Sequence, residues 1–108
     1  MSPAPEAASY RTPRFEVNVE DDDGAVVLRL AGELDLVSEP VFAGELAKIE
    51  DRPVRIDLSD LAFMDSTGLR ALLTTMRAHA DFKLRGPLQP PVQRLLELTQ
   101  TNTIFPFE

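Results

Sequence analysis

The chain has 108 residues, 44% of them hydrophobic, which is enough for one small domain with a single core. It contains no cysteine, so disulfides and thiolate metal sites are excluded. Its formal net charge of −7 argues against nucleic acid or an anionic membrane as a partner, and no apolar run approaches the roughly 20 residues of a membrane span. The N-terminus lacks the basic start and apolar stretch of a signal peptide, so we expect a cytoplasmic location.

The N-terminal part of the chain divides into a tail and the start of a sheet. Residues 1–13 mix proline, alanine, serine and threonine without periodicity, so we predict a flexible tail there and one domain over residues 14–108. Apolar and polar residues alternate over residues 15–19, which indicates a strand with one solvated face, near the edge of the sheet. Asp23-Gly24 then predicts a hairpin turn into an interior strand over residues 25–30.

Helices and strands alternate in the middle of the chain. Ser38 marks the start of a first helix as its cap, with a proline soon after it. Residues 54–58 alternate as a strand, and apolar residues at helical spacing predict a second helix over residues 66–79. Residues 82–85 then have the pattern of a short strand.

The chain closes with a third helix and an apolar segment. The helix presents its apolar face over residues 92–99, and we expect Ile104, Phe105 and Phe107 to dock on the sheet. Strand–helix–strand runs of this length imply right-handed parallel crossovers. We therefore predict an α/β fold, with a single small mixed β-sheet in the order β-β-α-β-α-β-α and the helices packed on it.

The chain changes from strand to helix at Asp65-Ser66-Thr67-Gly68. We predict that Ser66 is the N-cap of the second helix, where its hydroxyl faces solvent and the helix dipole favours negative charge. A Ser-Thr pair that opens a helix is often only a cap, and that interpretation stays open. A second acidic turn, over residues 32–35, leaves a neighbouring parallel strand. The carboxyl ends of parallel strands are where ligands and partners usually bind.

Catalytic, metal and nucleotide sites have little support in the sequence. The one histidine, His79, has no second histidine or cysteine with which to build a relay. Asp35, Asp57, Asp60 and Asp65 could form a divalent-metal cluster, but aspartates at strand ends and turns commonly serve local hydrogen bonds. No glycine-rich strand–loop–helix motif for nucleotide phosphates occurs. We therefore expect no catalytic residue, metal or cofactor.

Two short motifs follow one another in the predicted elements. The first is Gly32-Glu33-Leu34-Asp35 after an apolar strand, and the second is Asp57-Leu58-Ser59 with Met64-Asp65-Ser66-Thr67-Gly68-Leu69. Together they resemble the STAS domain of anti-sigma factor antagonists, and the helix over residues 92–99 is similar to the last helix of that family. The resemblance spans about residues 15–107.

The resemblance implies a partner-switching protein. Unphosphorylated antagonists of the family bind an anti-sigma factor, a serine kinase with a histidine-kinase-like ATPase fold, and so release a sigma factor. The kinase phosphorylates the serine of the motif, here Ser66, and a metal-dependent serine phosphatase reverses the modification. Thr67 is a secondary candidate for the phosphate. By the same resemblance, the expected partner-binding residues are Glu33, Asp35, Ser38, Asp65, Ser66, Thr67, Gly68 and Arg70.

Two other functions stay open. STAS-like domains also serve as constitutive structural or regulatory subunits of larger complexes, such as lipid-transport ATPases. An enzyme with Ser66 as its nucleophile is a third interpretation, although the motif lacks a base. The chain departs from the family pattern in a short segment over residues 76–82, and in Thr99-Gln100, where the family usually has a Thr-Gly pair after the last helix.

Overall fold

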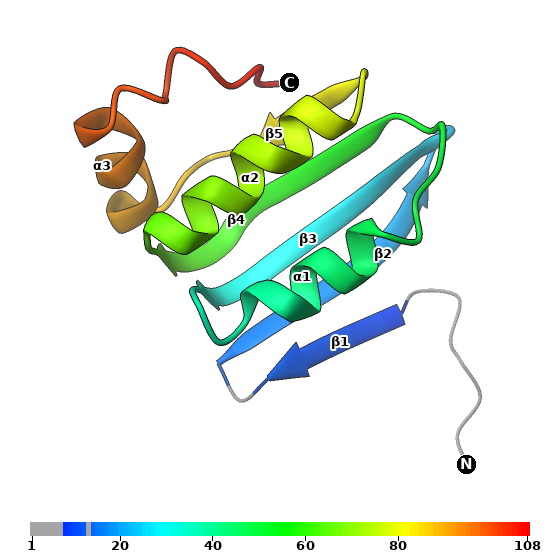
Figure 1. The fold of residues 1–108 in the computed structure, drawn as a ribbon, viewed down its shortest axis with the longest axis horizontal. Helices are drawn as coiled ribbons and strands as arrows, with labels where there is room; N and C mark the ends of the chain where they lie inside the picture. The colour runs from blue at the N-terminus through cyan, green and yellow to red at the C-terminus, as the bar shows by residue number, and fades with distance from the viewer. Residues whose placement is uncertain (1–7, 13) are drawn as a thin grey trace.

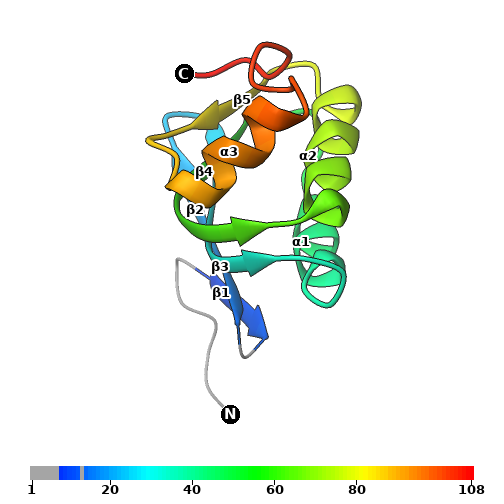
Figure 2. The ribbon, with the colours of Figure 1, turned by 90° about the vertical axis from the view of Figure 1, so that its left-hand side faces the viewer.

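A single mixed sheet with three helices makes up the fold. The computed structural model describes residues 8–12 and 14–108. Five strands lie in the order β1-β2-β3-β4-β5, and the helices α1 and α2 lie next to each other on one face of the sheet (Figures 1 and 2). The strands are β1 (Ala8–Thr12), β2 (Phe15–Asp22), β3 (Ala25–Leu34), β4 (Val54–Met64) and β5 (Phe82–Arg85), and the helices are α1 (Glu39–Leu46), α2 (Ser66–Ala78) and α3 (Pro90–Leu98).

The strand β1 corrects the prediction for the N-terminal residues. The sequence predicted a tail over residues 1–13, but β1 pairs antiparallel with β2, from Ala8 opposite Val19 to Thr12 opposite Phe15. The β1 sequence alternates only over Ala8, Tyr10 and Thr12, which is too short and too weakly apolar to indicate a strand. Consequently β1 forms the edge and β2 lies inside it, although β2 is nearer the edge than β3, as predicted. Residues 1–7 and 13 lie outside the described residues.

The predicted connections between the strands are confirmed. The strands β2 and β3 pair antiparallel through a tight turn in which Asp23 and Gly24 have φ angles of 55° and 88°. Two consecutive positive φ angles are typical of the hairpin turn that Asp-Gly favours. The pairs β3–β4 and β4–β5 are parallel, and each is connected by a helix that crosses over the same face of the sheet (Figure 2).

The core lies between the sheet and the helices. Phe42 from α1 and Leu72 from α2 are fully buried against apolar residues of the sheet. The helix α3 packs against β4 at one end of the sheet and buries Val92 and Leu96 there (Figure 2). None of the helices in residues 8–12 and 14–108 is long and apolar enough to cross a membrane.

The strand β4 is longer and less regular than the sequence predicted. It continues past Leu58 to Met64, and its pairing with β3 shifts register twice, between Arg29 and Ala31 and between Gly32 and Glu33. Each shift leaves one extra residue on β4, which bends a strand locally. The buried residues therefore change from a spacing of two to a spacing of three at Leu58, Leu61 and Met64.

The segment after α3 folds back on β5. Gln100, the residue at the unusual Thr-Gln position, has a φ of 59°, and the backbone N–H of Thr101 donates to the carbonyl of Leu96 at 2.9 Å. This is the pattern of a helix that ends in a left-handed residue. Phe105 is buried and Phe107 forms a parallel bridge to Leu84, so both dock on the sheet as predicted. Ile104 does not, because it is 54% exposed.

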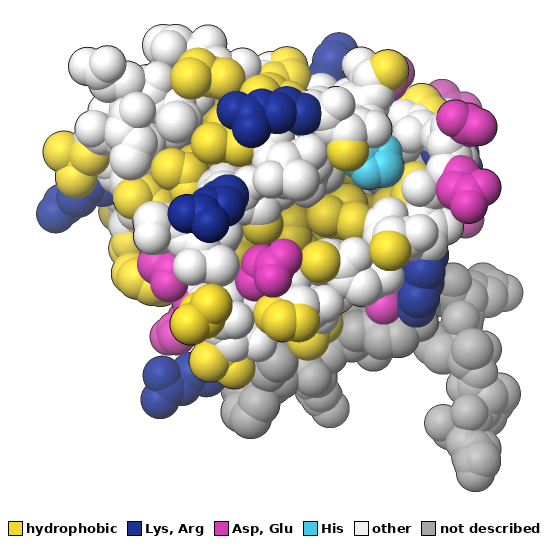
Figure 3. All heavy atoms as spheres, viewed as in Figure 1, with side chains coloured by type: hydrophobic (Ala, Val, Ile, Leu, Met, Phe, Trp, Pro, Cys, Tyr) yellow, Lys and Arg dark blue, Asp and Glu magenta, His cyan; other side chains and the backbone are white. Residues whose placement is uncertain are grey.

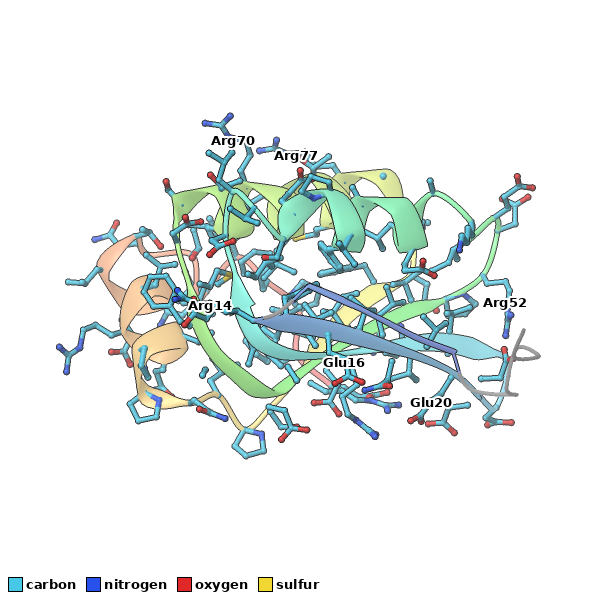
Figure 4. The ribbon with its side chains drawn as sticks, turned by 90° about the horizontal axis from the view of Figure 1, so that it is seen from below. Arg14, Glu16, Glu20, Arg52, Arg70 and Arg77 are labelled. Carbon is cyan, nitrogen blue, oxygen red and sulfur yellow. The ribbon has the colours of Figure 1, made fainter. Side chains whose placement is uncertain are left out.

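The face of the sheet opposite α1 and α2 carries charged side chains. Glu16 and Glu20 point away from the helices (Figure 4). Arg29 bonds Glu20 at 3.1 Å and lies 3.5 Å from Asp57. Burial works to raise the pKa of Asp57, but hydrogen bonds from Ser59 and the charge of Arg29 outweigh it, so this pKa lies below its ordinary value. Asp57 is thus part of an ion-pair network on the open face of the sheet.

Candidate functional site

The two acidic turns meet at one edge of the sheet. Leu34 and Met64 are partners at the ends of the parallel strands β3 and β4, so Asp35 and Asp65 leave the sheet next to each other. The backbone N–H of Asp65 donates to the carbonyl of Leu34 at 3.2 Å. The sequence prediction that the two turns share one edge is therefore confirmed.

Asp65, and not Ser66, is the N-cap of α2. One carboxylate oxygen of Asp65 accepts hydrogen bonds from the backbone N–H groups of Thr67 at 2.9 Å and Gly68 at 3.0 Å. Aspartate and serine are about equally good caps, and here the aspartate takes the role. Ser66 is the first residue of the helix and its side chain is exposed. The predicted solvent exposure of Ser66 is correct, and its predicted capping role is wrong.

Gly68 lets the start of α2 lie directly on the strand ends. A Cβ atom at this position would come within 2.6 Å of both the Leu34 carbonyl oxygen and the Met64 side chain. No side chain fits at such distances without displacing backbone. Gly68 is buried, so its contribution to the site is to hold α2 in position.

Asp35 and Ser38 form a hydrogen-bonded turn between β3 and α1. The Asp35 carboxylate accepts from the backbone N–H groups of Val37 and Ser38, each at 3.0 Å. The bond from the Ser38 N–H is the largest cause that lowers the pKa of Asp35, so its carboxylate is charged at neutral pH.

Ser38 has its place inside this turn and not on the surface. Its hydroxyl donates to the Glu33 carbonyl at 2.7 Å and accepts from the Asp35 N–H at 2.9 Å, and the residue is only 2% exposed. It makes no side-chain hydrogen bond as a helix cap. Ser38 is thus the N-cap residue of α1, as predicted, although its side chain bonds within the turn and not to the helix. Its expected role in partner binding stays a prediction.

The other expected binding residues surround Ser66 on two sides. Glu33 lies in β3, opposite Phe63 in the register, and pairs with Arg14 at 3.8 Å. Thr67 and Arg70 line one end of an apolar groove of about 470 Å³ between α1 and α2. Figure 3 shows apolar side chains gathered in this hollow, with basic side chains beside it.

Three exposed apolar residues extend the site beyond those predicted. Leu36 and Val37 are 73% and 74% exposed in the turn between β3 and α1, and Phe63 is 44% exposed near the end of β4. They belong to the same sheet edge as Asp35 and Asp65. In the sequence, the adjacent Leu36 and Val37 inside a polar turn could have indicated an exposed apolar surface. Phe63 could not, because the sequence pattern did not extend the strand β4 to that residue.

The other candidate chemistries do not gather at this edge. His79 follows the last residue of α2, about 20 Å along the helix from Ser66, so it cannot serve Ser66 as a base. In residues 8–12 and 14–108, no three of the His, Asp and Glu side chains are arranged to hold a metal ion. Asp57 lies farther back in β4, and Asp35 and Asp65 each use one carboxylate oxygen to accept from backbone amides. The feature that this edge offers is an exposed serine at the start of α2, beside two acidic turns.

Comparison with known proteins identifies the fold family. The sequence pattern that defines the STAS domain matches residues 16–108. The chain belongs to the STAS domain family. Its resemblance to that family, inferred from the two motifs, is thereby confirmed.

Individual relatives carry a more specific name. An anti-sigma-B factor antagonist from Bacillus subtilis (strain 168) is 33% identical over 65 residues, which are 58% of this chain and 60% of the relative. The crystal structure of an anti-sigma factor antagonist from Mycobacterium paratuberculosis has a TM-score of 0.80 and 28% identity, covering 91% of this chain and 89% of that one. The anti-sigma factor antagonist SpoIIAA in its unphosphorylated form has a TM-score of 0.66 and 25% identity, covering 81% and 83%. This STAS domain is thus similar to proteins that are named as anti-sigma factor antagonists.

Proposed function

We propose that this protein is an anti-sigma factor antagonist that binds an anti-sigma factor while Ser66 is unmodified and is released when Ser66 is phosphorylated. The observation that carries the proposal is the exposed Ser66 at the first residue of α2, directly after Asp65 and at the sheet edge where Asp35 leaves the neighbouring strand. The names of the similar proteins support it, since they are anti-sigma factor antagonists and one is described in its unphosphorylated form.

The rigid start of α2 suits a serine that a kinase must recognise and phosphorylate. Asp65 caps the first turn and Gly68 seats it on the ends of β3 and β4. The serine is therefore presented at a fixed position relative to the acidic turn at Asp35. Little conformational entropy is lost when a partner binds such a preorganised surface.

Charge supplies the switch in this proposal. A phosphate adds a charge of about −1.5 to −2 at neutral pH. It would join two carboxylates, Asp35 and Asp65, on a chain with a formal net charge of −7. A partner surface fitted to a neutral hydroxyl beside these carboxylates would be opposed by the modified one, because a phosphate is larger than a hydroxyl and its added charge would lose its water in the interface without a group placed to receive it.

The side chains exposed around Ser66 indicate what kind of partner surface would be complementary. Leu36, Val37 and Phe63 offer apolar contact area next to the two carboxylates. A complementary partner presents apolar side chains flanked by basic groups. We assign this role to an anti-sigma factor serine kinase with a histidine-kinase-like ATPase fold, in the cytoplasm, with a metal-dependent serine phosphatase to reverse the modification.

The proposal is tested with two substitutions at Ser66. Tagged Ser66→Ala protein, used as bait in a lysate of the source bacterium, should retain an anti-sigma factor kinase. The affinity of that kinase, measured by calorimetry, should be unchanged for Ser66→Ala and at least about tenfold weaker for Ser66→Asp, since a tenfold change is about 1.4 kcal/mol. Equal affinity of the two variants for the kinase would contradict the switch.

Thr67→Ala provides the matched control for the phosphate acceptor. This variant should still incorporate phosphate from ATP in the presence of the captured kinase, whereas Ser66→Ala should not. Phosphorylation of Ser66→Ala, absent from Thr67→Ala, would move the site to Thr67. An ATPase complex that retains the protein whatever residue stands at position 66 would favour the alternative, a constitutive subunit.

A further inference from the structure

Arg70 is a cation one helical turn from Ser66, with no ion-pair partner among the described residues. Both residues are exposed and lie four positions apart on α2, so their side chains share one face of the helix. Figure 4 shows Arg70 pointing away from the sheet on the outer side of α2, as Arg77 does. Within residues 8–12 and 14–108, Arg70 has no hydrogen bond or ion pair with another side chain.

The backbone around Ser66 offers little to a phosphate. The N–H groups of Thr67 and Gly68 are occupied by the Asp65 carboxylate, and that of Leu69 donates to the Asp65 carbonyl at 2.9 Å. The N–H groups of residues 67–69 are therefore committed before any modification takes place. These amides carry no full charge, so a counter-charge for a phosphate on Ser66 has to come from a side chain.

The other arginines near the site are less well placed. Arg14 is paired with Glu33 at 3.8 Å. Arg77 lies on the same side of α2, but seven residues farther from Ser66 than Arg70. At a rise of about 1.5 Å per residue, that adds about 10 Å. Among the side chains that the structure describes, Arg70 is the cation that lies one helical turn from Ser66.

We propose that Arg70 is the receptor for the phosphate on Ser66, and that phosphorylation creates an ion pair within α2 between residues 66 and 70. This inference rests on the proposed function, in which Ser66 is the modified residue. An acidic group four residues before a basic group is the favourable orientation in a helix. The guanidinium fork can bind two phosphate oxygens at once, so the pair is directional as well as electrostatic.

The ion pair changes what the site offers to a partner. Before modification, the Arg70 guanidinium is available at the end of the groove between α1 and α2. After modification it is drawn toward residue 66. Phosphorylation therefore adds negative charge and withdraws a cation in one step. A carboxylate in Ser66→Asp is shorter and has less charge, so it imitates this rearrangement incompletely.

The test measures the second ionisation of the phosphate by ³¹P NMR. Protein carrying phosphoserine at position 66, incorporated during synthesis, is titrated through the second pKa of the phosphate, which is about 6. A nearby cation favours the dianion and lowers this pKa. Arg70→Gln should raise it by about 0.3 unit, the effect of losing one exposed ion pair at this spacing.

Two further variants make the result specific. Arg77→Gln removes the same charge from the same side of α2 and should shift the phosphate pKa by less than about 0.1 unit, because the charge is distant and screened. Arg70→Lys should recover most of the shift, since it keeps the charge. Equal pKa values in the wild type and Arg70→Gln, or equal shifts in Arg70→Gln and Arg77→Gln, would overturn the proposal.

This test is separable from that of the proposed function. It needs only the phosphorylated protein, and neither a kinase nor a partner. If partners bound Ser66→Ala and Ser66→Asp with equal affinity, the proposed partner switch would fail. The second pKa of the phosphate would still decide whether Arg70 binds it. If Arg70→Gln left the pKa unchanged, the role of Arg70 would fail while the partner switch stood.

Discussion

Gly68 sets the distance between α2 and the ends of β3 and β4. Its missing side chain lets the Leu34 carbonyl and Met64 lie where a Cβ atom would otherwise be. The position of Ser66 depends on this contact, because Ser66 is two residues away in the same helical turn.

Gly68→Ala should therefore destabilise the fold. A methyl group 2.6 Å from a carbonyl oxygen has to push α2 away from the sheet, at a cost of about 2–3 kcal/mol. Gly44→Ala is the matched control in α1, because no atom lies within 4 Å of the added Cβ, and it should be neutral or stabilising by up to about 1 kcal/mol. Urea unfolding measures both, and equal stabilities of the two variants would contradict the account.

At the scale of single residues, the sequence predicted the helix start to within one position. Asp65 and Ser66 are both good caps, so propensity alone could not decide between them. The tight contact of Gly68 with β3 decides where the turn begins, and that contact depends on tertiary structure. Ser38 illustrates the same limit, because a buried hydroxyl that supports a turn and an exposed one look identical in the sequence.

The strand β4 carries both the site and an ion-pair network. Its apolar alternation ends at Leu58 because of the two register shifts relative to β3. Just before the first shift, Asp57 accepts hydrogen bonds from the Ser59 backbone N–H at 2.9 Å and the Ser59 hydroxyl at 2.6 Å. Asp57 therefore stabilises the point at which β4 bends toward the site.

Asp57 should make the stability of the fold depend on pH. Because the folded-state pKa of Asp57 lies below its ordinary value of 3.8, its stabilisation is complete above about pH 4 and is lost as the pH falls through the folded-state pKa. Asp57→Ala should cost about 2 kcal/mol at neutral pH and less in acid, as measured by urea unfolding. The exposed Asp60→Ala should stay within about 0.5 kcal/mol of the wild type. A cost of Asp57→Ala that does not change with pH would argue against this role.

At the scale of elements, the sequence predicted those whose apolar pattern matches their period. The helix α2 and the strands β2 and β5 each present a regular buried face, and all three were found. The second half of β4 was missed because its register shifts break the alternation, and β1 was missed because its alternation is short and weakly apolar. The shortened segment before β5 had little effect, since α2 ends at Ala78, one residue before the predicted end.

At the scale of the whole molecule, the fold separates a rigid scaffold from a charged surface. Ser66, Asp35 and the exposed Leu36 and Val37 lie outside the core, and the helix that carries Ser66 is fixed by Gly68 and Asp65. A phosphate on Ser66 therefore has no buried contact to break. We expect phosphorylation to act through surface charge and sterics, with little refolding.

Backbone chemical shifts test this expectation. On phosphorylation of Ser66, changes in the ¹H–¹⁵N spectrum should be confined to the first turns of α2 and the adjoining turns after β3 and β4. The amides of β2 and β5, which belong to the sheet and lie outside this edge, should not move. Ser66→Ala serves as the reference for changes that come from the side chain alone. Large shifts in β2 or β5 would show a conformational change and contradict the proposal.

The phosphorylation of Ser66 is tested by the intact mass of the protein taken from its own cells, with site mapping, before and after phosphatase treatment. We expect a phosphatase-sensitive species heavier by about 80 Da, the mass of one added phosphate, with the phosphate on Ser66. Absence of this species across growth and stress conditions, or a phosphate mapped only to another residue, would contradict the phosphorylation switch.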